Sequence, residues 1–179
     1  MIIYQPAEDS YLLEKYVKKF SKNKSFLDMG SGTGIQSIAA INSNALKVLA
    51  IDINPKSIKE LKKQNIPALK SNLFSNNKLK NKKFDIIAFN PPYLPRDKRE
   101  DKESQLATTG GKRGDEVILH FLKQAIQYLN PKGIILLIIS SQTPKDKIFP
   151  LIKKLNLKKS ILAKKKLFME ELEVWKLSQ

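Results

Sequence analysis

The chain has 179 residues, of which 41% are hydrophobic, and its 33 lysines and arginines against 17 aspartates and glutamates give a formal net charge of +16. This length predicts a single domain, residues 1–179, with a real hydrophobic core. With no cysteine, no apolar run of membrane length and no signal peptide, the sequence excludes disulfides and thiolate metal sites, and we expect a cytoplasmic protein with no membrane partner.

The positive charge comes almost entirely from lysine, because the chain has only three arginines, Arg96, Arg99 and Arg113. Such a balance favours anionic partners, and RNA or ribosome proximity is one interpretation. The other interpretation is that the lysines are spread over solvated faces of the protein and bind no particular partner. The scarcity of the planar guanidinium group argues against direct reading of a DNA sequence.

Short apolar runs alternate with helical stretches in the first half of the chain, as in βαβ units of a parallel sheet. Pro55 suits the first turn of a helix, and a row of apolar side chains predicts another helix before the first strand. The predicted elements are, in order, helix 9–20, strand 25–29, helix 35–42, strand 47–52, helix 55–64, strand 68–71 and strand 84–89.

The second half contains a helix from residue 115 or 116 to Leu129, which Asn130-Pro131-Lys132-Gly133 ends. The elements predicted after it are strand 134–139, helix 145–155, strand 158–162 and strand 167–177, with residues 164–166 joining the last two strands. The fold class is therefore Rossmann-like α/β: a seven-stranded, mostly parallel sheet with helices on both faces and an antiparallel last strand.

The segment from Leu94 to Gly114 is long, charged and rich in turn-forming residues. Loops of this length inside a compact domain are usually functional or disordered. Because it follows the motif to which we assign chemistry, we favour a loop that covers the substrate over a disordered one.

A glycine turn, Asp28-Met29-Gly30-Ser31-Gly32-Thr33-Gly34, follows the first predicted strand. Ligands of open α/β sheets bind beyond the carboxyl ends of strands, and glycine lets the backbone approach them closely. The spacing is one residue shorter than that of the dinucleotide fingerprint. Asp28 would repel a pyrophosphate but can pair with an ammonium group, which favours a cofactor with an amino-acid moiety. A tight strand-to-helix connection is the alternative interpretation.

Two further positions strengthen the prediction of a nucleoside-bearing cofactor. Asp52, at the end of the second strand, can accept hydrogen bonds from both ribose hydroxyls. Its alternative role is to cap the next helix, for which Asn54 competes. Asn72, after the third strand, can bind an adenine edge, with the backbone of Leu73 beside it.

Asn90-Pro91-Pro92-Tyr93, after the fourth predicted strand, is the more specific motif. The Asn90 side-chain carbonyl and the Pro91 backbone carbonyl could accept the two hydrogens of a planar amide or amine. The two prolines stiffen the turn, and Tyr93 can pack against the planar group. An exposed proline-rich turn is the alternative.

Together the two motifs resemble those of class I S-adenosylmethionine (SAM) methyltransferases that modify nitrogen. The segment Tyr4-Gln5-Pro6-Ala7-Glu8-Asp9-Ser10-Tyr11-Leu12-Leu13 is similar to the opening of the archaeal and eukaryotic HemK-like glutamine methyltransferases. Gly110-Gly111-Lys112-Arg113-Gly114-Asp115-Glu116-Val117 resembles a second stretch of the same group. The resemblance runs in order from Tyr4 to Val117.

The resemblance implies methyl transfer to the glutamine side chain of the Gly-Gly-Gln motif in a peptide chain release factor. It also implies a small zinc-ribbon activator subunit that adds a strand to the sheet edge near the third strand. Relatives often have Asp at position 72, so we expect weaker but not lost adenine binding. On this resemblance the residues that contact SAM are Ser10, Asp28, Gly30, Asp52, Asn72, Leu73 and Asn90, and the turn adds Gly32 and Gly34.

Two other functions stay open. The same Asn-Pro-Pro-Tyr turn serves adenine-N6 methyltransferases that act on RNA or DNA, and a SAM-binding or RNA-binding scaffold without activity is the third interpretation. No metal site is expected, because the single histidine, His120, has no partners at ligand spacing.

Overall fold

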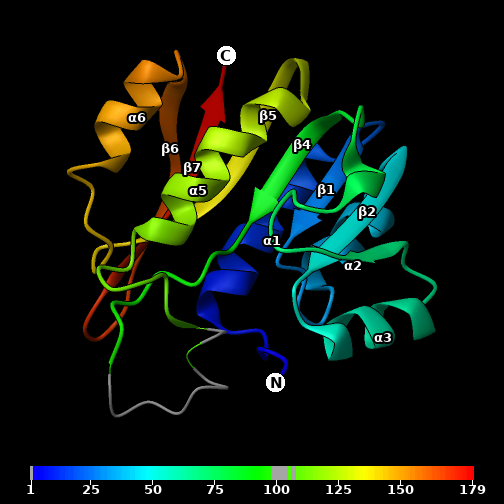
Figure 1. Ribbon diagram of the computed structural model, residues 1–179, viewed down its shortest axis with the longest axis horizontal. Helices are drawn as coiled ribbons and strands as arrows, with labels where there is room; N and C mark the ends of the chain where they lie inside the picture. Colours follow the sequence, from blue (N-terminus) through cyan, green and yellow to red (C-terminus); the bar gives the residue numbers. More distant parts are fainter. Residues whose placement is uncertain (1, 98–104, 106–107) are drawn as a thin grey trace.

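The computed structural model describes residues 2–97, 105 and 108–179 of the chain. Its centre is a seven-stranded sheet with the strand order β3-β2-β1-β4-β5-β7-β6 (Figure 1). All neighbouring strands pair in parallel except at β7, which is antiparallel to both β5 and β6. The strands are β1 (Ser25–Met29), β2 (Lys47–Asp52), β3 (Ala68–Lys70), β4 (Phe84–Phe89), β5 (Leu129–Ser140), β6 (Lys158–Lys166) and β7 (Glu171–Ser178).

Helices cover both faces of this sheet, which confirms the predicted fold class. On one face, α1 (Glu8–Phe20) and α2 (Ile35–Asn42) bury a core that includes Leu13 and Phe26, and α3 (Pro55–Lys63) packs beside β2 and β3. On the other face, α5 (Glu116–Ala125) and α6 (Ile148–Lys154) enclose the larger core with the short helices η1 (Asn77–Leu79) and η2 (Ile126–Tyr128).

The first half of the chain follows the prediction closely, whereas the region around Leu129 differs. The helix ends at Ala125, and Leu129 is buried as the first residue of β5, opposite Phe84. Because Asn130 precedes Pro131, the helical conformation is disfavoured there, and Lys132 has a positive φ of 64°. The four residues before Ile134 therefore form an irregularity within a longer strand.

The C-terminal hairpin also differs from the prediction. Lys164, Lys165 and Lys166 belong to β6 instead of joining two strands, and β7 begins at Glu171 instead of residue 167. Lys164 lies opposite Glu173 in the strand register, and its Nζ is 2.8 Å from that carboxylate. Three consecutive lysines alone do not favour a strand. Charge pairing with glutamates on the opposite strand stabilises them there.

Among the described residues, no helix combines the length and the hydrophobicity that crossing a bilayer requires. The predicted loop over residues 94–114 is described in part: Leu94 forms an isolated bridge with Thr109, whereas residues 98–104 and 106–107 lie outside the described residues. That this loop covers the substrate stays a prediction.

Candidate active site

The strand order reverses between β1 and β4, and a cavity of about 360 Å³ opens beyond the carboxyl ends of these strands. Met29 is paired with Phe89 in the register, so the chain leaves the sheet at Gly30 and Asn90 side by side. This adjacency places the two predicted motifs in one site. The predicted residues that line the cavity are Ser10, Asp28, Gly30, Gly32, Asp52, Asn72, Leu73, Asn90, Pro91, Pro92 and Tyr93.

The glycine turn is held by its own hydrogen bonds. Ser31 donates from its backbone nitrogen and from Oγ to the Ile51 carbonyl, and Gly30 and Gly32 have φ angles of 64° and 54°. Gly34 is the exception among the predicted residues, because it lies outside the cavity lining. A Cβ at Gly34 would come within 2.6 Å of Leu61 Cδ2, so this glycine serves helix packing.

Asp28 is buried at the end of β1, and its Oδ2 accepts hydrogen bonds from the backbone nitrogen and the hydroxyl of Ser37. Burial raises the pKa of Asp28 to about 7, although the bonds from Ser37 work against this rise. A carboxyl group in such surroundings gains most from a cationic ligand, which would favour its ionised form.

Asp52 is oriented by the backbone around it. Gly32 N donates to its Oδ2 at 2.8 Å, and Asn54 N donates to its Oδ1 at 2.7 Å. The helix cap is Asn54, whose Oδ1 accepts from Lys56 N, so Asp52 does not serve as the cap of α3. Each Asp52 oxygen retains acceptor capacity for a ligand hydroxyl in the cavity. Burial raises the pKa of Asp52 as well.

Leu73 is held in an uncommon backbone conformation, with a φ of 47°. The other described residues with side chains and positive φ are asparagines and one lysine, so a branched leucine in this region marks local strain. Its neighbour Asn72 is exposed, and both line the cavity below the end of β3. Strain retained at a cavity wall is consistent with a binding role for this backbone.

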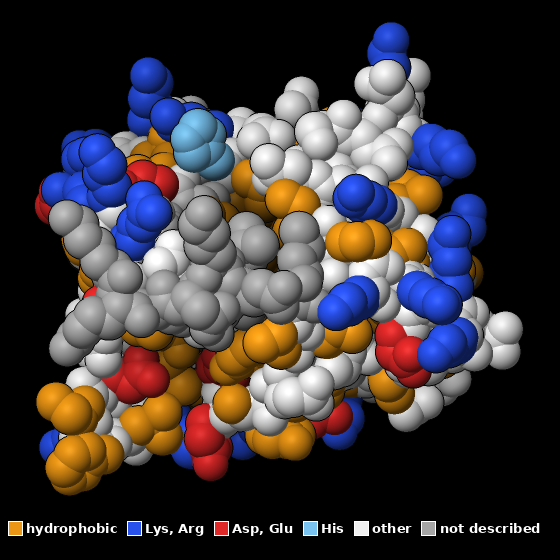
Figure 2. Space-filling model, turned by 60° about the horizontal axis from the view of Figure 1, so that its bottom comes forward, with side chains coloured by type: hydrophobic (Ala, Val, Ile, Leu, Met, Phe, Trp, Pro, Cys, Tyr) orange, Lys and Arg blue, Asp and Glu red, His pale blue; other side chains and the backbone are white. Residues whose placement is uncertain are grey.

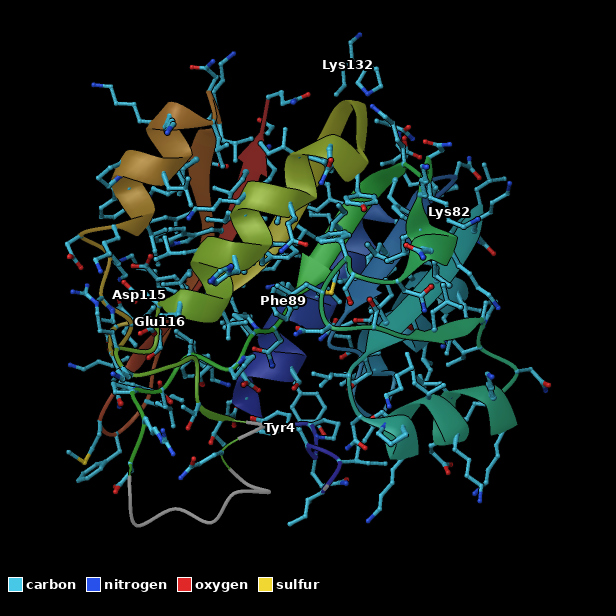
Figure 3. The ribbon with its side chains drawn as sticks, in the orientation of Figure 1. Tyr4, Lys82, Phe89, Asp115, Glu116 and Lys132 are labelled. Atoms are coloured by element: carbon cyan, nitrogen blue, oxygen red, sulfur yellow. The ribbon has the colours of Figure 1, made fainter. Side chains whose placement is uncertain are left out.

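The N-terminal segment forms a wall of the cavity that reasoning from residue chemistry does not find. Tyr4 donates from its hydroxyl to Asp9 Oδ2 at 3.0 Å, and its carbonyl lies 3.6 Å from the position of a Cβ on Gly32. The segment therefore passes over the glycine turn (Figure 3). The only signal for it is the resemblance of residues 4–13, since a tyrosine before a helix has no physical signature of its own.

Asn90 projects from the end of β4 into a polar gap. Its Nδ2 lies 3.5 Å from Ser10 Oγ, whereas its Oδ1 is buried and finds no hydrogen-bond partner among the described residues. The same is true of Gln36 Oε1, which belongs to another lining residue. Unpaired buried acceptors are costly, and at a ligand cavity they indicate groups that a bound molecule satisfies.

The Asn-Pro-Pro-Tyr turn is supported from outside by the turn over residues 110–116, which we call the glycine buttress. Gly110 N donates to Leu94 O, and a Cβ on Gly110 would be 2.7 Å from Pro92 O. A Cβ on Gly114 would be 2.5 Å from Tyr93 O. Only glycine therefore lets the two turns pack backbone against backbone.

Charged side chains hold the glycine buttress together. Glu116 accepts hydrogen bonds from the backbone nitrogens of Arg113 and Gly114, and the Arg113 guanidinium contacts Asp115 and Asp146. Figure 3 shows Asp115 and Glu116 at the first turn of α5. Residue chemistry alone gives no role to this stretch, because its function depends on a contact across the loop that the sequence does not display.

The site thus has two chemically different parts. The ends of β1 to β3 offer carboxylates and glycine backbone, which suit a cation and a pair of hydroxyls. The end of β4 offers an amide oxygen in a stiff turn, which suits a flat donor of hydrogen bonds. No cluster of three His, Cys, Asp or Glu side chains within the described residues is placed to hold a metal ion.

Comparison with known proteins gives consistent matches. The model of the Eco57I restriction-modification methylase family matches residues 7–168. A protein of Methanocaldococcus jannaschii, provisionally named as a protein N5-glutamine methyltransferase, is 39% identical over 98% of this chain and 92% of its own length. The release factor glutamine methyltransferase of Fusobacterium nucleatum is 34% identical over 81% of this chain, which spans 46% of that relative.

Among solved structures, the Mtq2–Trm112 complex of E. cuniculi, described as responsible for methylating the translation termination factor eRF1, has a similar fold. Its matching chain aligns with a TM-score of 0.78 over 100% of this chain and 99% of that chain, at 22% sequence identity.

Proposed function

Because the chain belongs to the Eco57I methylase family and to the protein N5-glutamine methyltransferases, we propose that it methylates the glutamine side chain of the Gly-Gly-Gln motif in a peptide chain release factor, with SAM as donor. The observation that carries this proposal is the buried, unpaired Oδ1 of Asn90. It lies in the same cavity as the glycine turn and the carboxylates of Asp28 and Asp52. A translation factor as substrate would place the enzyme in the cytoplasm.

The residues of the site fit SAM. Asp28 would hold the ammonium group of the methionine moiety, and Asp52 would accept from the ribose hydroxyls with the oxygens that Gly32 and Asn54 orient. The strained backbone of Leu73, beside Asn72, supports a contact with the adenine. Ser10 Oγ, 3.5 Å from Asn90 Nδ2, would help to fix the asparagine that separates the donor from the acceptor.

The bound cofactor supplies an electrophilic methyl group, and the chain positions the nucleophile. An amide nitrogen is a poor nucleophile, because its lone pair is delocalised. Asn90 Oδ1 and the Pro91 carbonyl would accept its two hydrogens, which aims the nitrogen and favours a pyramidal geometry as the new bond forms. Pro91 and Pro92 restrict the turn, so little reorganisation accompanies the reaction.

Tyr93 would pack against the plane of the substrate amide. Burial, and then the charge of Asp9, raise the pKa of Tyr93 far above its ordinary value, so the phenol stays neutral at every working pH. No strong base is needed, because an N-methylated, protonated amide loses its proton readily to water.

A competition experiment tests the proposal. The protein is incubated with labelled SAM and a mixture of release factor, tRNA and duplex DNA, with a release factor whose Gly-Gly-Gln carries Gln→Ala as the matched control. We expect label only in the unsubstituted release factor. Label in the nucleic acids alone would assign the chain to the adenine-N6 alternative that the name of the matching family model keeps open.

We also propose that a small zinc-ribbon subunit binds the edge of the sheet at β3. Ser71 N donates to Asp52 O and Ala50 N donates to Pro67 O, so residues 67 and 71 face β2, and Lys70 directs its backbone nitrogen outward. The outward carbonyl of Lys70 accepts from Asn76 Nδ2, and the outward nitrogen of Lys70 is the group that a partner strand can bind at this edge. The similar Mtq2 fold, which was solved as a complex with a second protein, Trm112, supports such an arrangement.

Lys70→Pro tests this edge, because proline removes the outward N–H and leaves the bonds to β2 in place. We expect the zinc-ribbon protein to co-purify with the unsubstituted chain and not with this variant, at an unchanged melting temperature. Equal recovery would move the partner to another surface.

The basic surface supports an approach to RNA or the ribosome. Lysine and arginine side chains gather on both sides of the face shown in Figure 2. We expect ribosome co-sedimentation at low salt that is lost as the salt concentration rises; no co-sedimentation at low salt would leave the lysines as solvated surface.

A further inference from the structure

The turn that joins β6 to β7, residues 167–170, exposes the two most accessible large apolar side chains among the described residues. Phe168 is 99% exposed and Met169 is 79% exposed. Figure 2 shows hydrophobic side chains protruding at one corner of this face, on the side where Figure 1 places the β6–β7 turn. Single exposed apolar residues are ordinary, but two adjacent ones at a projecting tip mark an interaction surface.

The backbone of this turn is held firmly by the end of β5. Leu167 N donates to Glu170 O at 2.7 Å, which closes the turn, and Ser140 Oγ donates to the Glu170 carboxylate at 2.6 Å. Ser141 Oγ accepts from Glu171 N at 2.9 Å. The backbone that carries Phe168 and Met169 is therefore fixed on both sides, and a preordered backbone loses little entropy on binding.

The turn lies at the same end of the sheet as the cavity. β6 runs parallel to β1 and β4, so its C-terminal end lies at the carboxyl edge where the Asn-Pro-Pro-Tyr turn begins. Ser140, whose hydroxyl donates to the Glu170 carboxylate, is the last residue of β5, the strand that pairs with β4, so the base of the turn lies at the edge of the sheet where the cavity opens. When the glutamine loop of a protein substrate enters the cavity, the rest of that protein must lie against the carboxyl edge of the sheet.

The charges beside the tip favour a protein over an anionic polymer or membrane. In a chain of net charge +16, the three lysines and three glutamates between residues 164 and 173 cancel. Lys164 pairs with Glu171 and Glu173, and Lys165 pairs with Glu8. Neutralised lysines offer little attraction to phosphate groups, so the apolar pair is the binding element.

We propose that Phe168 and Met169 form a docking surface for the body of the release factor whose glutamine enters the cavity. This inference rests on the function proposed above. The partner surface is apolar and lies outside the Gly-Gly-Gln loop, so the contact sets affinity for the intact factor and takes no part in the chemistry.

The test compares the double variant Phe168→Ser/Met169→Ser with a control, Ile41→Ser/Leu46→Ser, whose residues are 45% and 69% exposed near the opposite edge of the sheet. Methylation rates are measured with the intact release factor and with a short peptide that contains Gly-Gly-Gln. Removal of two apolar anchors should raise KM for the intact factor about tenfold or more. We expect kcat, the rate on the peptide, SAM affinity and melting temperature to be unchanged, and the control to match the unsubstituted protein.

Equal KM values for the two proteins, or an equal loss on the peptide, would overturn the docking surface while leaving the proposed function intact. If the unsubstituted protein does not methylate the release factor, the proposed function is overturned. The docking surface is then tested separately, by titrating the release factor with the unsubstituted protein and with the double variant. Equal binding by the two proteins, or no binding by either, would refute the docking surface. If the unsubstituted protein binds anionic vesicles and the double variant does not, the tip binds a membrane instead. If the unsubstituted protein is a dimer and the double variant is not, the tip binds a second copy of the chain.

Discussion

The two halves of the cavity are built in different ways. The half at the ends of β1 to β3 is held by hydrogen bonds to two carboxylates: Asp52 is oriented by Gly32 and Asn54, and Asp28 by Ser37. The half at the end of β4 depends on a distant segment, because the glycine buttress packs against the carbonyls of Pro92 and Tyr93. In both halves a contact joins residues about twenty positions apart, Gly32 with Asp52 and Tyr93 with Gly114, but the first half is held by hydrogen bonds to carboxylates and the second by close packing of backbones.

This difference separates two kinds of failure. A change in the first half should weaken cofactor binding, and a change in the second should lower turnover at nearly constant cofactor affinity.

Asn90→Ala should lower kcat by ~10² to 10³ and leave SAM affinity nearly intact, because the lost oxygen acts on the substrate as the transition state forms. Initial rates and calorimetry measure the two quantities. Asn72→Ala is the matched control, since it removes an amide from the first half and should weaken SAM binding instead. Unchanged turnover in Asn90→Ala would remove this residue from the mechanism.

Asp28→Asn should change how stability depends on pH. Burial raises the pKa of Asp28 from 3.8 to about 7 in the free folded protein, so the folded state holds the proton over the interval in which the unfolded chain has lost it. Its contribution to stability is therefore full below pH 4, and falls as the pH rises to about 7.

The free energy of unfolding of the Asp28→Asn variant, relative to the unsubstituted protein, should accordingly increase by roughly 3 kcal/mol between pH 4 and pH 7, on the scale of about 1.36 kcal/mol per unit of pKa shift. Urea unfolding at several pH values measures this difference. A constant difference would show that Asp28 is ionised throughout.

Asp52→Ala should weaken SAM binding by about 30-fold or more, because a charged acceptor for two hydroxyls is lost. Calorimetry gives the affinity. Glu60→Ala, which breaks only a surface pair with Lys63, serves as the control. If SAM binds both variants equally well, the ribose role of Asp52 is wrong.

Gly114→Ala should lower kcat by about tenfold with less than a threefold change in SAM affinity. The new Cβ would lie 2.5 Å from Tyr93 O at a φ of 95°, so the buttress must shift and the Asn-Pro-Pro-Tyr turn with it. Lys112→Ala, in the same turn and exposed, should have no effect on either quantity. A loss of cofactor affinity equal to the loss of turnover would mean that the two halves are one unit.

The same contrast explains what the sequence can predict. The seven strands and their directions follow from hydrophobic periodicity and from the turns between them. Glycine and carboxylate placement brings Asp28, Gly30, Gly32 and Asp52 to one cavity, and their contact with a cofactor stays a prediction. Gly34 lies outside the cavity lining, and spacing cannot distinguish a glycine that faces a ligand from one that faces Leu61. Tyr4, Asp9 and Glu116 cannot be found from residue chemistry, because their hydrogen-bond partners lie close in the sequence and only the fold brings their segments against the glycine turn and the Asn-Pro-Pro-Tyr turn.

Errors in the elements have the same origin. The pattern of Lys164 to Lys166 indicates a connection because the opposing glutamates lie on another strand, and the irregularity at Lys132 hides the start of β5. In both places a tertiary contact outweighs the local preference of the residues.

The most direct test of this account is tandem mass spectrometry of release factor that has been incubated with the protein, its zinc-ribbon partner and SAM. We expect one added methyl group on the side-chain nitrogen of the glutamine in Gly-Gly-Gln, and none when the Asn90→Ala variant replaces the unsubstituted enzyme. A methyl group on any other residue, or an unmodified factor beside methylated adenine in added nucleic acid, would contradict it.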